Sequence, residues 1–176
     1  LKAKPHNSAK DHMGQIYEST WKDSLYGVVL WLTLKSEDRV GDLMEAHIGA
    51  VNKTLPNRTL SDEVRPIHDA RLQNDGSLKE DHPPAAQPRH RGLAREHFWW
   101  SARHPGVGQL CAKLDVNRAF KWHCVRPTDA AEFGTRFPGA PVGVPGDVLV
   151  VYCVLTFGWT GSPGEFMAFT WVAKWL

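Results

Sequence analysis

Residues 148–166 read VLVVYCVLTFGWTGSPGEF, an apolar run that passes through two close glycines into the start of a helix. Its first part is almost entirely aliphatic or β-branched, which is typical of a strand buried on both faces. Ser162 suits a helix cap, Pro163 the first helical position, and Glu165 completes a capping-box pattern. The stretch predicts a buried strand, a glycine turn that lies close to a ligand, and a capped helix.

The rest of the chain mixes strand and helix patterns. Its 176 residues and 42% hydrophobic content indicate one globular domain of the α/β (α+β) class. The expected strands are 25–34, 64–70, 109–114, 121–125 and 147–156, with a Gly/Pro-rich hairpin connection at 138–145.

Helical and irregular segments fill the remaining positions. Residues 36–51 have the apolar period of an amphipathic helix, and the aromatic cluster 98–100 indicates a helix ending near His104. Residues 75–92 contain several prolines and read as a long connection. Residues 1–23 are polar and aperiodic, which predicts a loose arm.

Composition narrows the cellular setting. The three cysteines lie in apolar surroundings without disulfide or C-x-x-C spacing, as expected for reduced thiols in an intracellular protein. No apolar run approaches the ~20 residues that span a bilayer, and no secretory leader is visible, so we expect a soluble, non-secreted protein without a membrane partner. Leu1 at the start and an uncapped apolar helix at the end predict a piece of a longer protein.

The net charge of +2 is too small to indicate nucleic-acid binding by itself, but the charge is uneven. Between residues 89 and 104, four arginines and three interleaved histidines oppose only Glu96. This stretch is a candidate phosphate-binding surface. A solvated basic helix face explains the same pattern.

Two further segments carry charge at informative positions. Asp115 follows the apolar segment 109–114, and a carboxylate at the end of a buried strand requires a cation, an arginine or a turn that it caps. Arg65, Asp69 and Arg71 fall on one face of an extended strand, where the carboxylate can orient a guanidinium toward phosphate. A surface salt-bridge ladder is the simpler reading of that trio.

Taken together, three segments resemble the fingers and palm of reverse transcriptases. The pattern Arg65-x-x-x-Asp69-x-Arg71-x-x-Asn74 is similar to a fingers motif of that family. Asp115 with Phe120 five residues later resembles the first catalytic palm motif, and residues 157–166, FGWTGSPGEF, resemble the substrate-and-template loop that follows. The resemblance covers residues 58–176 and includes nothing in 1–57, an N-terminal arm with a fingers-side strand and helix. Phe157 is the variant typical of retrotransposons.

The resemblance implies a partial right-hand polymerase fold and a role for each matched residue. Asp115 is the expected catalytic carboxylate, and with the Val116 carbonyl it binds Mg²⁺ or Mn²⁺, two ions in the complete enzyme. Phe120 excludes a 2′-hydroxyl. Arg65 binds the triphosphate of the incoming dNTP, and Arg58 is a second candidate phosphate contact.

Three more residues are expected against the nucleotide and the template. These are Phe157, Gly158 and Trp159, where a glycine permits close backbone approach and an aromatic ring stacks on a base. The implied partners are an RNA or DNA template with its primer, a dNTP, and the remaining polymerase domains, namely a thumb with or without RNase H and integrase regions.

One departure from the family is decisive for activity. Reverse transcriptases have a second acidic motif, usually Tyr-x-Asp-Asp, after the helix that begins near Pro163, and this chain ends within that helix. One carboxylate cannot hold two divalent cations, because each ion needs several oxygen ligands. The chain alone is therefore expected not to polymerise.

Three alternatives stay open. The first is a non-catalytic nucleic-acid-binding remnant of such a polymerase. The second is a serine hydrolase with Ser162 as nucleophile, although the G-x-S-x-G pattern fails at Thr160 and no histidine follows the serine. The third is a zinc-binding module built on Cys111, His123 and Cys124, although the last two are adjacent and point to opposite faces of a strand.

Overall fold

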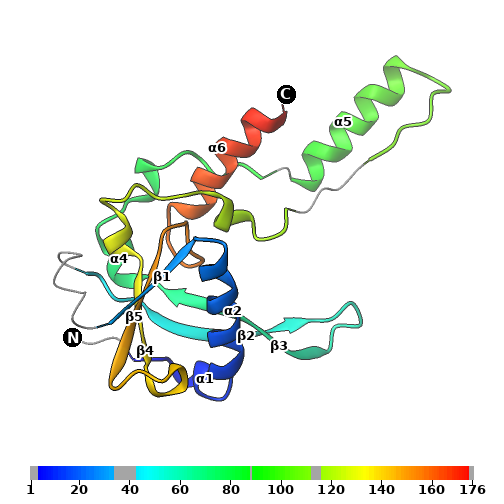
Figure 1. Ribbon diagram of the computed structural model, residues 1–176. Coiled ribbons are helices and arrows are strands. Elements are labelled where there is room, and N and C mark those ends of the chain that lie inside the picture. The colour runs from blue at the N-terminus through cyan, green and yellow to red at the C-terminus, as the bar shows by residue number, and fades with distance from the viewer. Residues whose placement is uncertain (1–3, 34–42, 88, 112–115, 175–176) are drawn as a thin grey trace.

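The computed structural model describes residues 4–33, 43–87, 89–111 and 116–174, and it is a mixed α/β structure with two small antiparallel sheets (Figure 1). The first sheet has the order β1 (Val29–Thr33), β5 (Asp147–Tyr152), β4 (Gly134–Pro138). The second sheet pairs β2 (His47–Thr54) with β3 (Leu60–Asp69). This confirms the expected fold class at the level of mixed helices and sheets.

The central strand β5 organises the first sheet. It pairs with β1 from Val29 opposite Tyr152 to Thr33 opposite Val148, and with β4 along its other edge. Residues 148–152 are all buried, which confirms the strand that the apolar run predicts. The β4–β5 connection contains the short 3-10 helix η4 (Ala140–Val142), in agreement with the expected Gly/Pro-rich hairpin.

The two sheets are joined where the chain enters β2. The Ala46 amide donates to the Gly134 carbonyl at 2.8 Å, and the Thr135 hydroxyl donates to the Ala46 carbonyl at 2.9 Å. A buried ion pair between Glu45 and Arg136 crosses the same junction. These contacts hold the β2–β3 hairpin against β4, so the end of β3 lies close to the loop after β5.

The N-terminal segment is helical, so the expected loose arm at 1–23 is wrong over its described residues. Helix α1 (Asn7–Lys10) is followed by α2 (Met13–Leu25), which packs against β1 and β3. Ile16 of α2 is fully buried and contributes about 1.5–3 kcal/mol of hydrophobic stabilisation. Three of its residues repeat at the period of a helix face, namely Ile16, Thr20 and Asp23, and all three are buried.

Two other expectations also differ from the structure. Residues 47–51 of the expected helix at 36–51 lie in β2 instead, where the buried Ile48 and Ala50 alternate with less buried residues. Residues 121–125 form no strand. They contain the end of the 3-10 helix η2 (Ala119–Trp122) and a single bridge from Cys124 to Val154.

The remaining expected elements agree in part. Residues 64–70 lie in or beside β3, and β1 lies within the expected 25–34. Helix α5 (His90–Arg103) contains the aromatic cluster and ends at His104, as predicted. Residues 109–111 form no strand, and residues 112–115 lie outside the described part.

Helix α6 (Ser162–Lys174) confirms the helix predicted after the glycine turn, but the capping box is wrong. The helix already begins at Ser162, whose hydroxyl donates to the Thr156 carbonyl at 2.7 Å. The Glu165 side chain contacts His82 instead of turning back to the helix start. A buried serine hydroxyl next to a strand end bonds to the nearest carbonyl that lacks a partner.

A buried carboxylate holds the segment after residue 115 against α2. Asp23 has a 2% exposed side chain and accepts from the Arg118 guanidinium at 2.5 Å and from the Lys121 ammonium. Arg118 has a left-handed backbone, with φ of 57°, and precedes η2. Asp23 thereby fixes the chain direction from Val116 to Trp122.

We predict that Asp23→Ala lowers the free energy of unfolding by about 3–5 kcal/mol, because it leaves two partly buried cations without their anion. Asp129→Ala is the matched control, since Asp129 pairs with the exposed Arg126 at 2.7 Å. We expect that control to cost less than about 1 kcal/mol. Urea unfolding measures both values, and similar losses for the two variants would contradict the anchoring role of Asp23.

Candidate functional site

The loop after β5 passes directly over the end of β3. Gly158 has φ of 107°, and a Cβ built on it would lie 2.0 Å from the His68 carbonyl oxygen. Only glycine fits this position, because both the backbone conformation and the close approach exclude a side chain. The turn predicted to touch a ligand thus first touches the protein's own backbone.

Asn74 joins the fingers-like motif to this loop. It lies on the short helix α4 (Arg71–Asp75), directly after β3. Its amide nitrogen donates to the Gly158 carbonyl at 2.9 Å, and its amide oxygen accepts from the Thr160 backbone N–H at 2.8 Å. The two ends of one side chain therefore hold both sides of the turn. Gln73 fixes the same helix by donating to the Glu132 carbonyl at 2.8 Å.

Phe120 lies beside the first residue of the loop. Its ring centroid is 4.7 Å from that of Phe157 and 5.7 Å from that of Phe166, both in edge-to-face geometry. Phe157 stays 57% exposed, so this aromatic pair faces solvent on one side. The described structure thus brings together residues from all three motifs of the sequence.

The structure describes only one of the two residues that are expected to bind metal. Asp115 lies outside the described residues, and Val116, which follows it, is exposed. Asp23 holds Arg118 two residues further on, so the segment leading to Phe120 has a fixed anchor. Among the described residues, no group of three His, Cys, Asp or Glu side chains is placed to hold a metal ion.

The two candidate phosphate-binding arginines lie on the β2–β3 hairpin. Arg65 is exposed on β3 opposite Val51, and Arg58 is exposed in the turn between the strands with φ of 66°. Within the described part of the chain, neither guanidinium pairs with a carboxylate. The hairpin extends away from the first sheet, and its turn does not reach the loop at 157–160 (Figure 1).

Asp69 pairs with only one of the two flanking arginines. Arg71 binds it through both nitrogens, with Nε at 2.8 Å and a terminal nitrogen at 2.5 Å. This hydrogen bonding lowers the pKa of Asp69 below its usual value. The expected alignment of three charges on one strand face is wrong in one respect, because Arg71 opens α4 instead of continuing β3.

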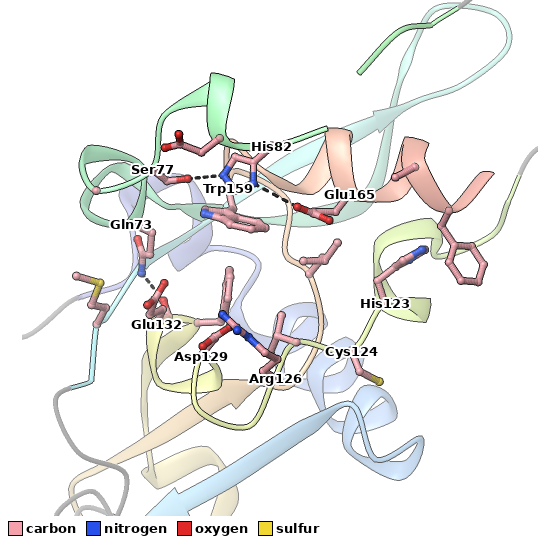
Figure 2. Close-up of a pocket in the computed structure, with 18 residues that line it drawn as sticks. Gln73, Ser77, His82, His123, Cys124, Arg126, Asp129, Glu132, Trp159 and Glu165 are labelled. Carbon is pink, nitrogen blue, oxygen red and sulfur yellow. Dashed lines mark hydrogen bonds and ion pairs between the residues drawn. The ribbon is translucent and has the colours of Figure 1, made fainter. Parts of the chain in front are cut away.

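Trp159 lines a cavity of about 930 Å³ (Figure 2), whereas Phe157 packs on Phe120 and is not among the residues that line this cavity. Its ring packs edge-on against Phe133 and His82, with centroids 5.4 Å and 4.8 Å apart. Gly161 lies under the ring, where a Cβ would approach the indole to 2.5 Å. The three residues expected against one nucleotide therefore have different surroundings.

Three side chains that line this cavity, those of Ser77, His82 and Glu165, are linked by hydrogen bonds. The Ser77 hydroxyl is 2.6 Å from His82 Nε2, and His82 Nδ1 is 3.3 Å from the Glu165 carboxylate (Figure 2). Pro83 lies against the first turn of α6, where a Cβ on Gly164 would be 2.0 Å from the Pro83 carbonyl oxygen. These contacts attach the long connection to α6, a role that neither His82 nor Glu165 signals in the sequence.

The residues of the serine-hydrolase and zinc-binding alternatives do not form the sites that those alternatives need. Ser162 is buried with its hydroxyl donated to a backbone carbonyl, so it is not presented to a substrate. The His123 ring packs against Phe169 with centroids 4.7 Å apart, and Cys111 and Cys124 are exposed thiols. Neither arrangement gathers the groups that its chemistry requires.

His68 is the most unusual titratable group near the loop. It is buried in β3 with its ring 4.4 Å from the Tyr152 ring, and among the described residues neither ring nitrogen has a hydrogen-bond partner. Burial lowers the pKa of His68 to about 4, and the positive charge of Lys121 adds to this effect. The ring is therefore neutral in the folded protein at neutral pH.

No protein-family model matches this chain, and a search of the curated proteins finds no match. None of the helices in the described ranges is long and apolar enough to span a membrane. The division at residues 57 and 58 stays a prediction, although β1 and β2 from the first part pair with β5 and β3 from the second.

We predict that Gly158→Ala lowers the free energy of unfolding by about 3 kcal/mol or more, because the new methyl group collides with the His68 carbonyl. Gly143→Ala is the matched control. Gly143 also has a positive φ, of 73°, but open space surrounds it. Its cost is expected to be about 1–2 kcal/mol, the backbone strain alone. Thermal and urea unfolding compare the two, and a smaller loss at Gly158 would contradict the close approach.

We predict that the protein loses stability as the pH falls from 6.5 to about 4, the range between the ordinary pKa of histidine and that of His68. In this window the unfolded chain binds a proton that the folded chain does not, so stability falls by up to about 3 kcal/mol. His68→Phe removes this part of the pH dependence and keeps the ring contact. The exposed His90, changed to Phe, serves as the control. An unchanged pH profile in His68→Phe would exclude the buried histidine as its source.

Proposed function

We propose that this chain is the fingers-and-palm part of a retroelement reverse transcriptase. Such an enzyme is an RNA-directed DNA polymerase, a nucleotidyltransferase that joins dNTPs to a primer 3′-hydroxyl. Under this proposal the loop at 157–160, Phe120 and the chain at Asp115 line the nucleotide site, and Arg65 contacts the triphosphate. The partners are a primed RNA or DNA template, a dNTP and the remaining polymerase domains.

The observation that carries the proposal is the pair of hydrogen bonds between the Asn74 side chain and the loop, one donated to the Gly158 carbonyl and one accepted from the Thr160 N–H. It joins two motifs that are 84 residues apart in the sequence and were identified without reference to any contact. Phe120, from the third motif, packs on the same loop. Three unrelated segments would rarely meet at one loop by chance, whereas the residues of an active site must do so.

The exposed residues have the chemistry that the proposal needs. Phe120 and Phe157 form a partly exposed aromatic pair, and under this proposal the Phe120 ring blocks space next to the sugar. Arg65 is exposed and unpaired among the described residues, so its guanidinium is available to phosphate oxygens. Trp159 instead packs against His82 and Phe133, so we propose that it supports the loop and does not contact the nucleotide.

Divalent metal ions would supply charge neutralisation at the triphosphate and activation of the primer hydroxyl. Asp115 and the Val116 carbonyl are the residues of this chain that would bind them. Under this proposal the other ligands belong to the second acidic motif of the family, and residues 1–176 contain no Tyr-x-Asp-Asp motif. The 176 residues alone are thus expected to lack polymerase activity.

The alternative is a non-catalytic nucleic-acid-binding remnant of such a polymerase. It shares the loop and the arginines, and it differs only in lacking the further carboxylates. The coding sequence beyond Leu176 distinguishes the two, because an intact Tyr-x-Asp-Asp motif there would identify the enzyme and a stop codon would identify the remnant.

We predict that residues 1–176 give no Mg²⁺-dependent primer extension, whereas a chain continued by the coding sequence beyond Leu176 does. In the continued chain, Asp115→Asn lowers the extension rate by more than about 100-fold, because a metal ligand is lost. Phe120→Ala increases the incorporation of ribonucleotides relative to deoxynucleotides. A primed-template assay with each nucleotide type measures both effects.

Trp21→Ala is the control for the second substitution, because Trp21 is an exposed aromatic residue on α2 outside the candidate site. Circular dichroism must show that each variant is folded. Normal extension by Asp115→Asn would reject the metal assignment. A continued chain that binds a primed template but never extends it would favour the remnant.

A further inference from the structure

Helix α5 has an exposed surface that the candidate site does not use. None of its fourteen described residues is buried, and the helix stands apart from both sheets (Figure 1). Three of these exposed residues are large aromatic ones: Phe98 is 77% exposed, Trp99 48% and Trp100 50%. Exposed aromatic groups in such density mark a binding surface.

The same helix is strongly basic. Arg91, Arg95 and Arg103 share one stripe with Trp99, since the four residues are spaced by four along the helix. Successive positions on this stripe are about 6 Å apart along the axis. The Arg103 guanidinium lies 4.6 Å from the Trp99 ring centroid. Glu96 is the one acidic residue of α5, so the stripe is suited to an anion with repeating charges.

A hollow adjoins the other indole. Trp100 stacks on His104, with ring centroids 5.2 Å apart and an angle of 22° between the planes. Together with Val107, Gln109 and Leu110 they line a space of about 450 Å³. The Gln109 side chain hydrogen-bonds to the Ser101 hydroxyl at 2.8 Å, which holds the segment after α5 next to the helix. A planar ligand ring in this hollow would therefore contact the stacked Trp100 and His104 rings and the Gln109 amide.

We propose that α5 and residues 104–110 form a binding site for single-stranded nucleic acid. The arginine stripe contacts backbone phosphates, and Trp100 with its hollow accepts an unpaired base. An acidic peptide would neutralise the arginines but would leave the indoles exposed, whereas every base has a face that stacks on an aromatic ring. A duplex hides those faces in its own stack. The proposal does not rest on the polymerase assignment, because it uses no residue of the candidate site.

The test is fluorescence anisotropy of labelled oligothymidylate and oligouridylate with the full 176-residue chain, over a range of salt concentrations. Arg95→Ala combined with Arg103→Ala should reduce the slope of log affinity against log salt by about 1.4, since each phosphate contact contributes about 0.7 for a single strand. Trp100→Ala should weaken binding about 5- to 100-fold at one salt concentration. Because no residue of α5 is buried, these variants should stay folded.

Matched controls lie outside α5. Arg126→Ala removes an exposed arginine, and Trp21→Ala removes an indole that is 56% exposed on α2. Neither should change the affinity or the salt slope. Equal losses in the controls, tighter binding to the same sequence as a duplex, or stronger binding of polyglutamate than of the oligonucleotides would overturn the proposal. Comparison of the thymidylate and uridylate affinities distinguishes a DNA from an RNA ligand.

Discussion

The contact on which the structure depends most is the approach of the Gly158 backbone to the His68 carbonyl, closed on its other side by the Asn74 side chain. It brings the loop after the central strand β5 against the end of β3, and so connects the two sheets a second time. A side chain at position 158 would separate them. The different surroundings of Phe157 and Trp159 follow from this fixed turn, as does the start of α6 at Ser162.

Buried charge supplies the second constraint. Asp23 draws Arg118 and Lys121 onto α2, and Glu45 with Arg136 joins the entry of β2 to β4. Such buried pairs add little net stability, because desolvation offsets much of the attraction. They favour one arrangement of the chain, however, because any other arrangement would leave an unpaired charge inside the protein. In this chain they determine which segments meet, while the apolar core around Ile16 and Phe137 provides most of the stabilisation.

The sequence predicted the elements that depend on local pattern. The unbroken apolar run of β5, the helix after the glycine turn and a helix around residues 98–100 were all recognisable, although α5 begins within the expected connection at 75–92. The errors arose where tertiary contacts decide. The apolar residues of 47–54 fit both the helical and the strand period, and the pairing with β3 determines that the segment is a strand. Residues 13–25 look polar because the buried face of α2 includes Thr20 and Asp23. The bridging role of Asn74 could not be foreseen, since it depends on a loop 84 residues away.

The absence of any buried residue in α5 bears on the length of the segment around it. The body of the protein folds around contacts made before residue 88 and after residue 116, and the His82 and Pro83 contacts with α6 secure the connection just ahead of the helix. Lengthening an exposed segment between two fixed points costs little, since loop entropy grows only with the logarithm of length. The length of residues 89–110 could therefore change without disturbing the contacts within the two sheets.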